Sequence, residues 1–136
     1  TIHEHVSHKQ MKHLILLFLI LSSTCFSQIK TEFLVGTWKF ENTTDYQYTI
    51  IESSVKEFDL IIHNAGNFEI NGVEYSISGK WKLVDAILDL TGKRNDKEET
   101  QTEKLIIHSL DEDKLSIEIN LEDAPKALMN LKRIKK

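Results

Sequence analysis

The chain is poor in the residues that mark several common kinds of small protein. Its 136 residues include one cysteine, one proline and two methionines, and acidic side chains outnumber basic ones by 21 to 17. A single cysteine excludes an internal disulfide framework and a four-cysteine zinc site. The acidic balance disfavours a nucleic-acid partner. With 40% hydrophobic and 28% charged residues, the composition is typical of one globular domain and not of a disordered chain.

The one long hydrophobic run lies near the N-terminus. Eight apolar residues, 14–21, follow Met11-Lys12-His13 and precede a stretch of small polar residues. This order is typical of a secretory signal peptide, and the run is far shorter than the ~20 residues that span a bilayer, so we expect no transmembrane helix. We interpret residues 1–10 as an upstream extension, 11–27 as a signal peptide and 28–136 as the mature domain.

Cys25 leaves open a second way of processing this leader, which is lipid attachment. A lipobox needs an aliphatic residue three places before the cysteine, but Ser22 stands there, so cleavage after Ser27 is favoured. Both routes export the protein, to the periplasm or to the extracellular space. Residues 28–136 carry 15 basic and 20 acidic side chains, which disfavours binding to an anionic membrane.

Hydrophobic residues in the mature domain alternate with a period of two, which predicts β-strands. Local turns join the clearest of these strands into hairpins. The predicted hairpins pair 58–63 with 68–70 around a Gly-containing turn, 80–84 with 87–90 around Asp85-Ala86, and 104–109 with 115–122 around a polar turn.

Three further strands are expected at 37–41, 46–52 and 73–78. Asn71-Gly72 is a strong two-residue hairpin signal, so the strand at 68–70 is alternatively followed at once by the one at 73–78. Residues 93–102, where charges of both signs alternate, are predicted to be a long solvated loop. Eight or nine short strands with local connections indicate an up-and-down β-barrel or a sandwich.

The C-terminal segment has two readings. Asp123, Pro125 and the spacing of Leu128, Leu131 and Ile134 indicate a capped helix. In the other reading, Met129, Leu131 and Arg133 form the inward face of a last strand. Periodicity alone does not decide between them.

One local motif resembles a known family. The segment 33–40, Phe-Leu-Val-Gly-Thr-Trp-Lys-Phe, is similar to the first strand of small bacterial lipocalin-like domains, which opens with glycine, any residue and tryptophan. The resemblance extends over most of residues 33–135. It includes the turn 64–67 with Phe68, the run 79–83 and the ending 131–134.

The resemblance implies an all-β fold, an antiparallel up-and-down barrel of about eight strands that follows the signal peptide. Trp38, two residues after Gly36, would plug the closed end, and Arg133 on the last strand would pack over its ring. It also implies a final strand from about Leu128, with a helical turn around 123–127.

Candidate catalytic chemistry is sparse. The two histidines of the mature domain, His63 and His108, lie at strand positions where an outward or rim imidazole is the favoured reading. The turn 111–113 lacks the glycine and the spaced oxygen ligands of a calcium loop. No nucleophile elbow, phosphate-binding glycine loop or HExxH run occurs in the sequence. We therefore expect no enzyme, no cofactor and no metal site.

Two functional hypotheses follow. In the first, the exported, monomeric protein carries a small apolar ligand in its barrel. In the second, the barrel is filled by its own side chains and acts through its loops as an interaction or inhibitor module, which the large inward side chains favour. The candidate ligand-lining residues are Phe58, Leu60, Ile62, Phe68, Trp81, Leu115, Ile117 and Ile119.

The leader yields the first testable prediction. The intact mass of the exported protein should match a chain that begins at Gln28. A mass that includes lipid on Cys25 would instead make it a membrane-anchored protein, and retention in the cytoplasm would contradict both forms of export.

Overall fold

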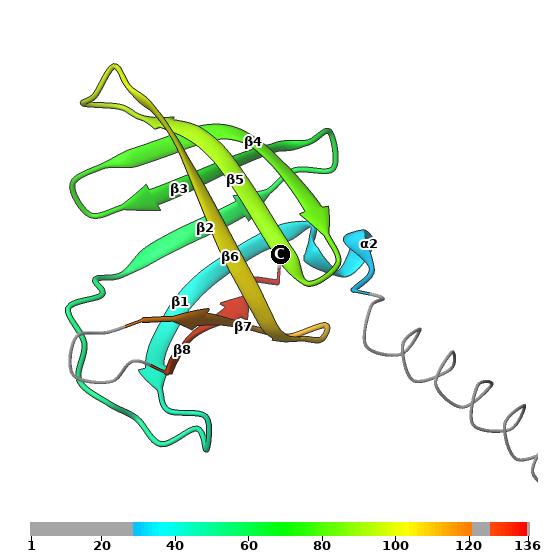
Figure 1. Cartoon of the computed structure of the whole chain (residues 1–136), viewed down its shortest axis with the longest axis vertical. Helices are drawn as coiled ribbons and strands as arrows, with labels where there is room; N and C mark the ends of the chain where they lie inside the picture. The colour runs from blue at the N-terminus through cyan, green and yellow to red at the C-terminus, as the bar shows by residue number, and fades with distance from the viewer. Residues whose placement is uncertain (1–28, 121–125, 136) are drawn as a thin grey trace, which may run out of the picture.

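The period-two pattern is realised as eight strands in a computed structural model that describes residues 29–120 and 126–135 (Figure 1). Outside this part lie the predicted extension 1–10 and the predicted signal peptide 11–27 with Cys25. Most of the helical turn predicted around 123–127 also lies outside it, and only its last two residues are described. None of the helices described is long and apolar enough to cross a membrane. The elements are α2 (Thr31–Leu34), β1 (Gly36–Thr44), β2 (Phe58–Ile62), β3 (Asn67–Gly72), β4 (Ser76–Val84), β5 (Ile87–Arg94), β6 (Thr100–Leu110), β7 (Lys114–Ile119) and β8 (Ala127–Arg133).

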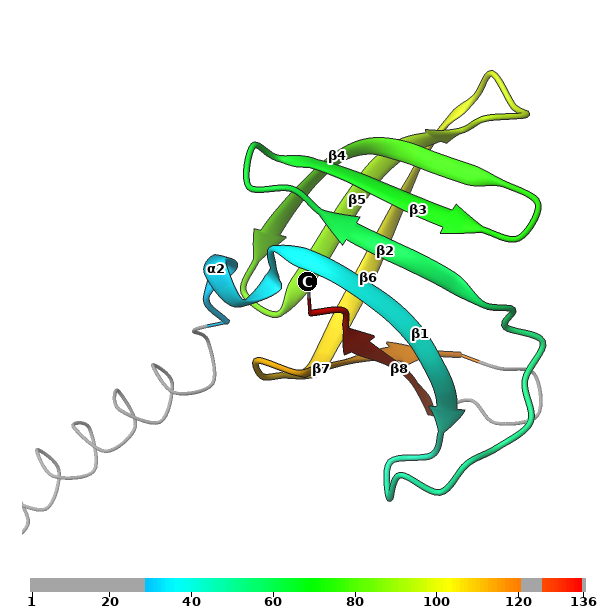
Figure 2. The ribbon, with the colours of Figure 1, turned by 180° about the vertical axis from the view of Figure 1, so that it is seen from behind.

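Each strand pairs with its neighbours in sequence, and β1 pairs antiparallel with β8 to close the barrel. Figure 2 shows this closure, with β1 sweeping across the sheet beside β8. The up-and-down barrel is therefore confirmed and the sandwich is excluded. Closure leaves no long sheet edge on these two strands, and such edges promote aggregation in open sheets.

The connections alternate between two ends of the barrel because successive strands are antiparallel. The turns β2–β3, β4–β5 and β6–β7 share one end with α2, which we call the closed end (Figure 1). The loops 45–57, 73–75 and 95–99 lie at the other end, the open end.

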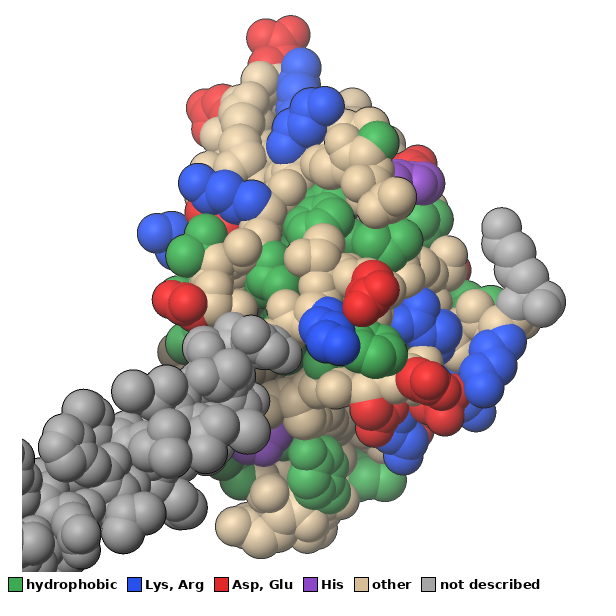
Figure 3. Space-filling model, turned by 90° about the vertical axis from the view of Figure 1, so that its right-hand side faces the viewer, with side chains coloured by type: hydrophobic (Ala, Val, Ile, Leu, Met, Phe, Trp, Pro, Cys, Tyr) green, Lys and Arg blue, Asp and Glu red, His purple; other side chains and the backbone are tan. Residues whose placement is uncertain are grey.

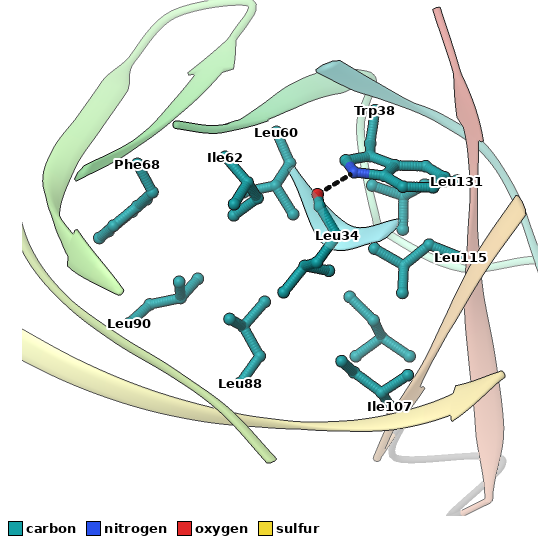
Figure 4. Packing of buried hydrophobic residues seen from close by; sticks show 11 residues of the cluster. Leu34, Trp38, Leu60, Ile62, Phe68, Leu88, Leu90, Ile107, Leu115 and Leu131 are labelled. Carbon is teal, nitrogen blue, oxygen red and sulfur yellow. Dashed lines mark hydrogen bonds between the residues drawn. The ribbon is translucent and has the colours of Figure 1, made fainter. Parts of the chain in front are cut away.

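Trp38 anchors the closed end. Its side chain is fully buried, and its Nε1–H donates a hydrogen bond of 2.8 Å to the carbonyl oxygen of Leu34 in α2. Figure 4 shows this bond together with core residues such as Leu88 and Leu115. The indole thus meets both its apolar and its polar requirement inside the barrel, which a buried tryptophan needs for stable packing.

Arg133 covers this plug from the last strand. It is paired with Trp38 in the β1–β8 register, and its guanidinium carbon lies 4.2 Å from the centroid of the Trp38 ring. Nη1 donates to the carbonyl of Val35 at 2.8 Å, and Nη2 donates to the carbonyl of Phe33. The packing of Arg133 over Trp38 is confirmed, and it joins the two ends of the described domain.

Gly36 makes the approach of Arg133 possible. Its φ of 143° is one that residues with a side chain rarely adopt, and an added Cβ would lie 2.3 Å from Nη1 of Arg133. A second close approach lies deeper in the barrel, where Gly92 faces Gly79 across β4 and β5. A Cβ on Gly92 would lie 2.8 Å from the Phe68 ring, so the glycine leaves room for that buried ring.

The prediction of a strand at 46–52 is wrong. These residues belong to the loop 45–57, where one isolated bridge joins Thr44 to Ile50. The Asp45 carboxylate accepts the backbone N–H groups of Gln47 and Thr49, each at 2.9 Å, and Tyr48 has a φ of 62°. An aspartate side chain that binds the backbone in this way favours a turn over a strand.

Two boundaries also differ from prediction. The predicted loop 93–102 shrinks to 95–99, because β5 and β6 pair as far as Lys93 opposite Thr100. β-branched threonines suit this exposed ladder, and the hydroxyls of Thr91 and Thr102 lie 3.1 Å apart. The chain does return directly from β3 into β4, but through residues 73–75 and not through an Asn71-Gly72 turn.

The C-terminal segment is a strand, β8, as the resemblance implied. Met129 is half-buried and Leu131 is buried in the core. The side chain of Asn130 points the other way and donates to Asn42 and Thr44 on β1 at 3.1 and 2.9 Å. These bonds add a polar seam where the barrel closes.

Trp38→Ala should lower the free energy of unfolding by about 3–5 kcal/mol, as a truncation of a fully buried aromatic side chain. Trp38→Phe should lose less, because a phenyl ring still fills much of the space of the indole, although the hydrogen bond to Leu34 is lost. Urea denaturation of the folded domain measures both. Lys39→Ala, at an exposed neighbouring position, is the control and should change stability by less than about 0.5 kcal/mol; an equal loss there would contradict the anchoring role of Trp38.

Candidate functional site

The candidate site is an apolar cavity inside the open end of the barrel, which we call the cup. It has a volume of about 170 Å³, and seven strands, β2 to β8, contribute to its wall. The strand residues that line the cup point inward, because they alternate in register with the core residues nearer the closed end. Its lining residues are Phe58, Leu60, Ile70, Tyr75, Ile77, Leu90, Glu103, Leu105, Ile117 and Met129.

The floor of the cup is the top of the core. Leu60, Leu90 and Ile117 are buried and belong to the core cluster that Figure 4 shows in part, whereas Ile70 and Ile77 are half-buried and pack against it. Core side chains fill the barrel from Trp38 at the closed end toward the open end, because the interior of an eight-stranded barrel is just wide enough for its own side chains. The cup is the space that this filling leaves at the open end.

Two polar side chains are part of the lining. Tyr75 is the last residue of the β3–β4 connection 73–75, and Glu103 lies on β6 in the inward row that continues with Leu105 and Ile107. The Arg94 guanidinium carbon lies 4.9 Å from the centroid of the Tyr75 ring. Nε of Arg94 also lies 2.7 Å from Oδ1 of Asp96, in an ion pair without hydrogen-bond alignment.

A second, larger hollow of about 480 Å³ lies beside the cup on the other side of β6. Glu103 and Leu105 border both spaces, and Lys104, Glu118 and Lys126 are charged residues of the hollow. Tyr46 also lines it. A hydrogen bond between its hydroxyl and the Glu118 carboxylate, together with the charge of Glu118, raises the pKa of Tyr46.

A third hollow, of about 580 Å³, lies against the β2–β3 turn. Its polar side chains bind one another: Nζ of Lys80 donates to Asn67 at 2.7 Å, and His63 Nε2 lies 2.7 Å from a Glu69 oxygen. These side chains are already paired with one another, so the larger volume does not make this hollow the better ligand site. The apolar cup is the stronger candidate because hydrophobic lining supplies most of the affinity for small molecules.

The structure distributes the eight candidate lining residues over different places. Phe58, Leu60 and Ile117 line the cup. Ile62, Phe68 and Leu115 are buried in the core outside it. Trp81 is half-buried and donates from Nε1 to the carbonyl of His63 at 2.8 Å, and Ile119 lines the hollow beside β6.

Several cup residues were missed by the sequence analysis. Ile77 and Leu105 lie within predicted strands, in the same alternating rows as residues that were selected, and so could have been found. Glu103 could not be predicted as a cup residue, because it lies next to the predicted loop 93–102, where a glutamate is ordinarily solvated. The inward face of β6 begins before that predicted boundary.

Other chemistry-bearing residues lie on the outer surface. His63 and His108 are both exposed, and the His108 ring lies 5.0 Å from Tyr46 and 6.5 Å from Tyr48, centroid to centroid. In the part of the chain that the structure covers, no group of three or more His, Cys, Asp or Glu side chains is placed to hold a metal ion. On the face seen in Figure 3, basic and acidic side chains are interspersed.

Comparisons of the chain with protein-family models, with curated proteins and with solved structures gave no match. The barrel and its cup are therefore the basis on which a function is proposed.

The different depths of Ile117 and Ile119 yield a prediction. Ile117→Ala should lower the free energy of unfolding by about 3 kcal/mol, because it truncates a fully buried core side chain. Ile119→Ala should cost about 1 kcal/mol or less, since Ile119 is half-buried outside the core cluster. Denaturant unfolding of the two variants measures the difference, and equal losses would place Ile119 in the core.

Proposed function

We propose that this protein binds a small hydrophobic molecule, or the hydrophobic end of a longer one, in the cup. The observation that carries the proposal is a half-open cavity of about 170 Å³ at the open end, with apolar side chains making up most of its wall. An apolar cavity of about 150 Å³ is large enough for benzene. The cup therefore suits one aromatic ring or a short branched alkyl group.

The size of the cup also limits its affinity. A ring of this size buries on the order of 200 Å² of apolar surface, which at about 25 cal/mol per Å² contributes about 5 kcal/mol. Because association also costs translational and rotational freedom, this contribution sets a limit, and the dissociation constant of such a ring should be no lower than about 0.1–1 mM. Tighter binding would need contacts between the rest of a longer ligand and the rim.

The family and the location form part of the same proposal. The contacts that join Gly36, Trp38 and Arg133 support kinship with small lipocalin-like proteins, in which the resemblance implies the same arrangement. The leader at 11–27 supports export to the periplasm or the extracellular space.

A barrel that is filled by its own side chains and acts through its loops is the second candidate function. One observation favours it: the cup is smaller than the ~300–1,000 Å³ of ordinary small-molecule pockets. The long loop 45–57 at the open end would then form part of the contact surface, with Ile50 as an exposed apolar side chain.

Titration with 2-phenylethanol, followed by NMR of the methyl groups, separates the two functions. Binding in the cup should shift the signals of Leu60, Ile117 and Met129 and saturate at millimolar or lower concentration. Ile117→Trp should abolish these shifts by filling the cup, and Leu105→Trp, at a half-buried position, is a second filling variant if the first one does not fold.

Val84→Trp is the matched control, because it adds the same bulk on the outer face of β4, where Val84 is 54% exposed. It should leave binding unchanged. Shifts that persist in the filling variants, or that spread over the outer surface, would contradict binding in the cup. No shift from this ligand or from neutral alkanols would favour the interaction module.

A further inference from the structure

The chemistry of the cup is set by one carboxylate. Glu103 is the only acidic or basic residue of its lining, and the rest of the wall is apolar apart from Tyr75. Glu103 pairs with Leu90 across the β5–β6 ladder, and both residues belong to the lining. A ligand whose apolar part fills the cup and whose polar group reaches the β6 side of the rim would place that group near this carboxylate.

The neighbouring cations leave Glu103 without a partner among the described residues. The charge of Arg94 is directed to Asp96, while its guanidinium covers the Tyr75 ring. Lys104 and Lys126 border the hollow beside β6, and neither forms an ion pair with Glu103. A positive group supplied by a ligand would thus complete a pair that the described residues do not form.

The loops around the cup strengthen the same preference. Three of the open-end loops, 45–57, 73–75 and 95–99, together carry seven carboxylates and two lysines. Charges of one sign around a cleft with low-dielectric walls raise the local concentration of ligands of opposite sign. On the face of the molecule shown in Figure 3, by contrast, basic and acidic side chains are mixed.

We propose that the cup selects amphiphilic amines, that is, ligands in which one or two carbon atoms separate an aromatic or short branched apolar group from a protonated nitrogen. The apolar group occupies the cup, and the ammonium group binds the Glu103 carboxylate at the rim. Carboxylates of the same shape, fatty acids included, are disfavoured by the same charge. This proposal rests on the proposed function, since it assigns the ligand class of the same cavity.

Three ligands of matched shape test the proposal: 2-phenylethylamine, 2-phenylethanol and phenylacetate. At low ionic strength the amine should bind about fivefold more tightly than the alcohol, and the acid more weakly than the alcohol, as expected for a solvent-exposed charge pair. The gap between amine and acid should narrow as salt is added, because the Debye length falls. NMR titration measures all three dissociation constants.

Glu103→Gln should reduce the preference for the amine over the alcohol to about twofold or less, while the alcohol binds as before. Glu103→Lys should reverse the order, so that phenylacetate binds best. Asp85→Asn is the matched control: it removes one negative charge from the β4–β5 turn at the closed end, and asparagine tolerates the φ of 56° found there. This variant should keep the wild-type order.

The outcomes separate the two proposals. Failure of 2-phenylethanol to bind, or binding that survives Ile117→Trp, overturns the proposed function itself. Normal binding of the alcohol together with equal affinity for amine and acid, or an amine preference that persists in Glu103→Gln, overturns the ligand class and leaves binding in the cup intact.

Discussion

The contact between Arg133 and Trp38 is the interaction on which the rest of the barrel depends. It joins the first strand to the last at the point where the sheet closes, and its hydrogen bonds fasten the segment around α2 across the closed end. The stacked guanidinium contributes roughly 0.5–2 kcal/mol. Burial of the indole contributes more to stability than the guanidinium does, because truncation of a buried tryptophan to alanine costs about 3–5 kcal/mol. The arginine therefore mainly fixes geometry, whereas the tryptophan supplies most of the stability.

Closure at one end determines what is possible at the other. Because Trp38 and Leu34 fill the closed end, the space for a ligand lies at the open end, above Leu60, Leu90 and Ile117. The cup there is small, so under the proposed function a bound molecule would make few apolar contacts. A single charged side chain at the rim, such as Glu103, would then have a larger share in the choice of ligand than it would in a wide barrel.

Local patterns in the sequence predicted the fold well where strands are half-buried, as in β2 and β7, since apolar and polar residues alternate there. They failed where a side chain competes with the ladder or where a strand is exposed on both faces. Asp45 binds backbone N–H groups and turns the segment 45–57 away from the sheet. The first residues of β6, Thr100–Lys104, are exposed, so only their pairing with β5 makes them a strand.

The sequence by itself determined most of the strands and the hairpins between them, because these depend on local periodicity, and the family resemblance implied the packing of Arg133 over Trp38. Only the tertiary structure decided which inward residues line the cup and which are buried beneath it. Leu115 and Ile117 follow the same alternation on β7, yet only Ile117 reaches the cup. A period of two specifies the face of a strand, whereas depth along the barrel axis is set by the tilt and stagger of all eight strands together.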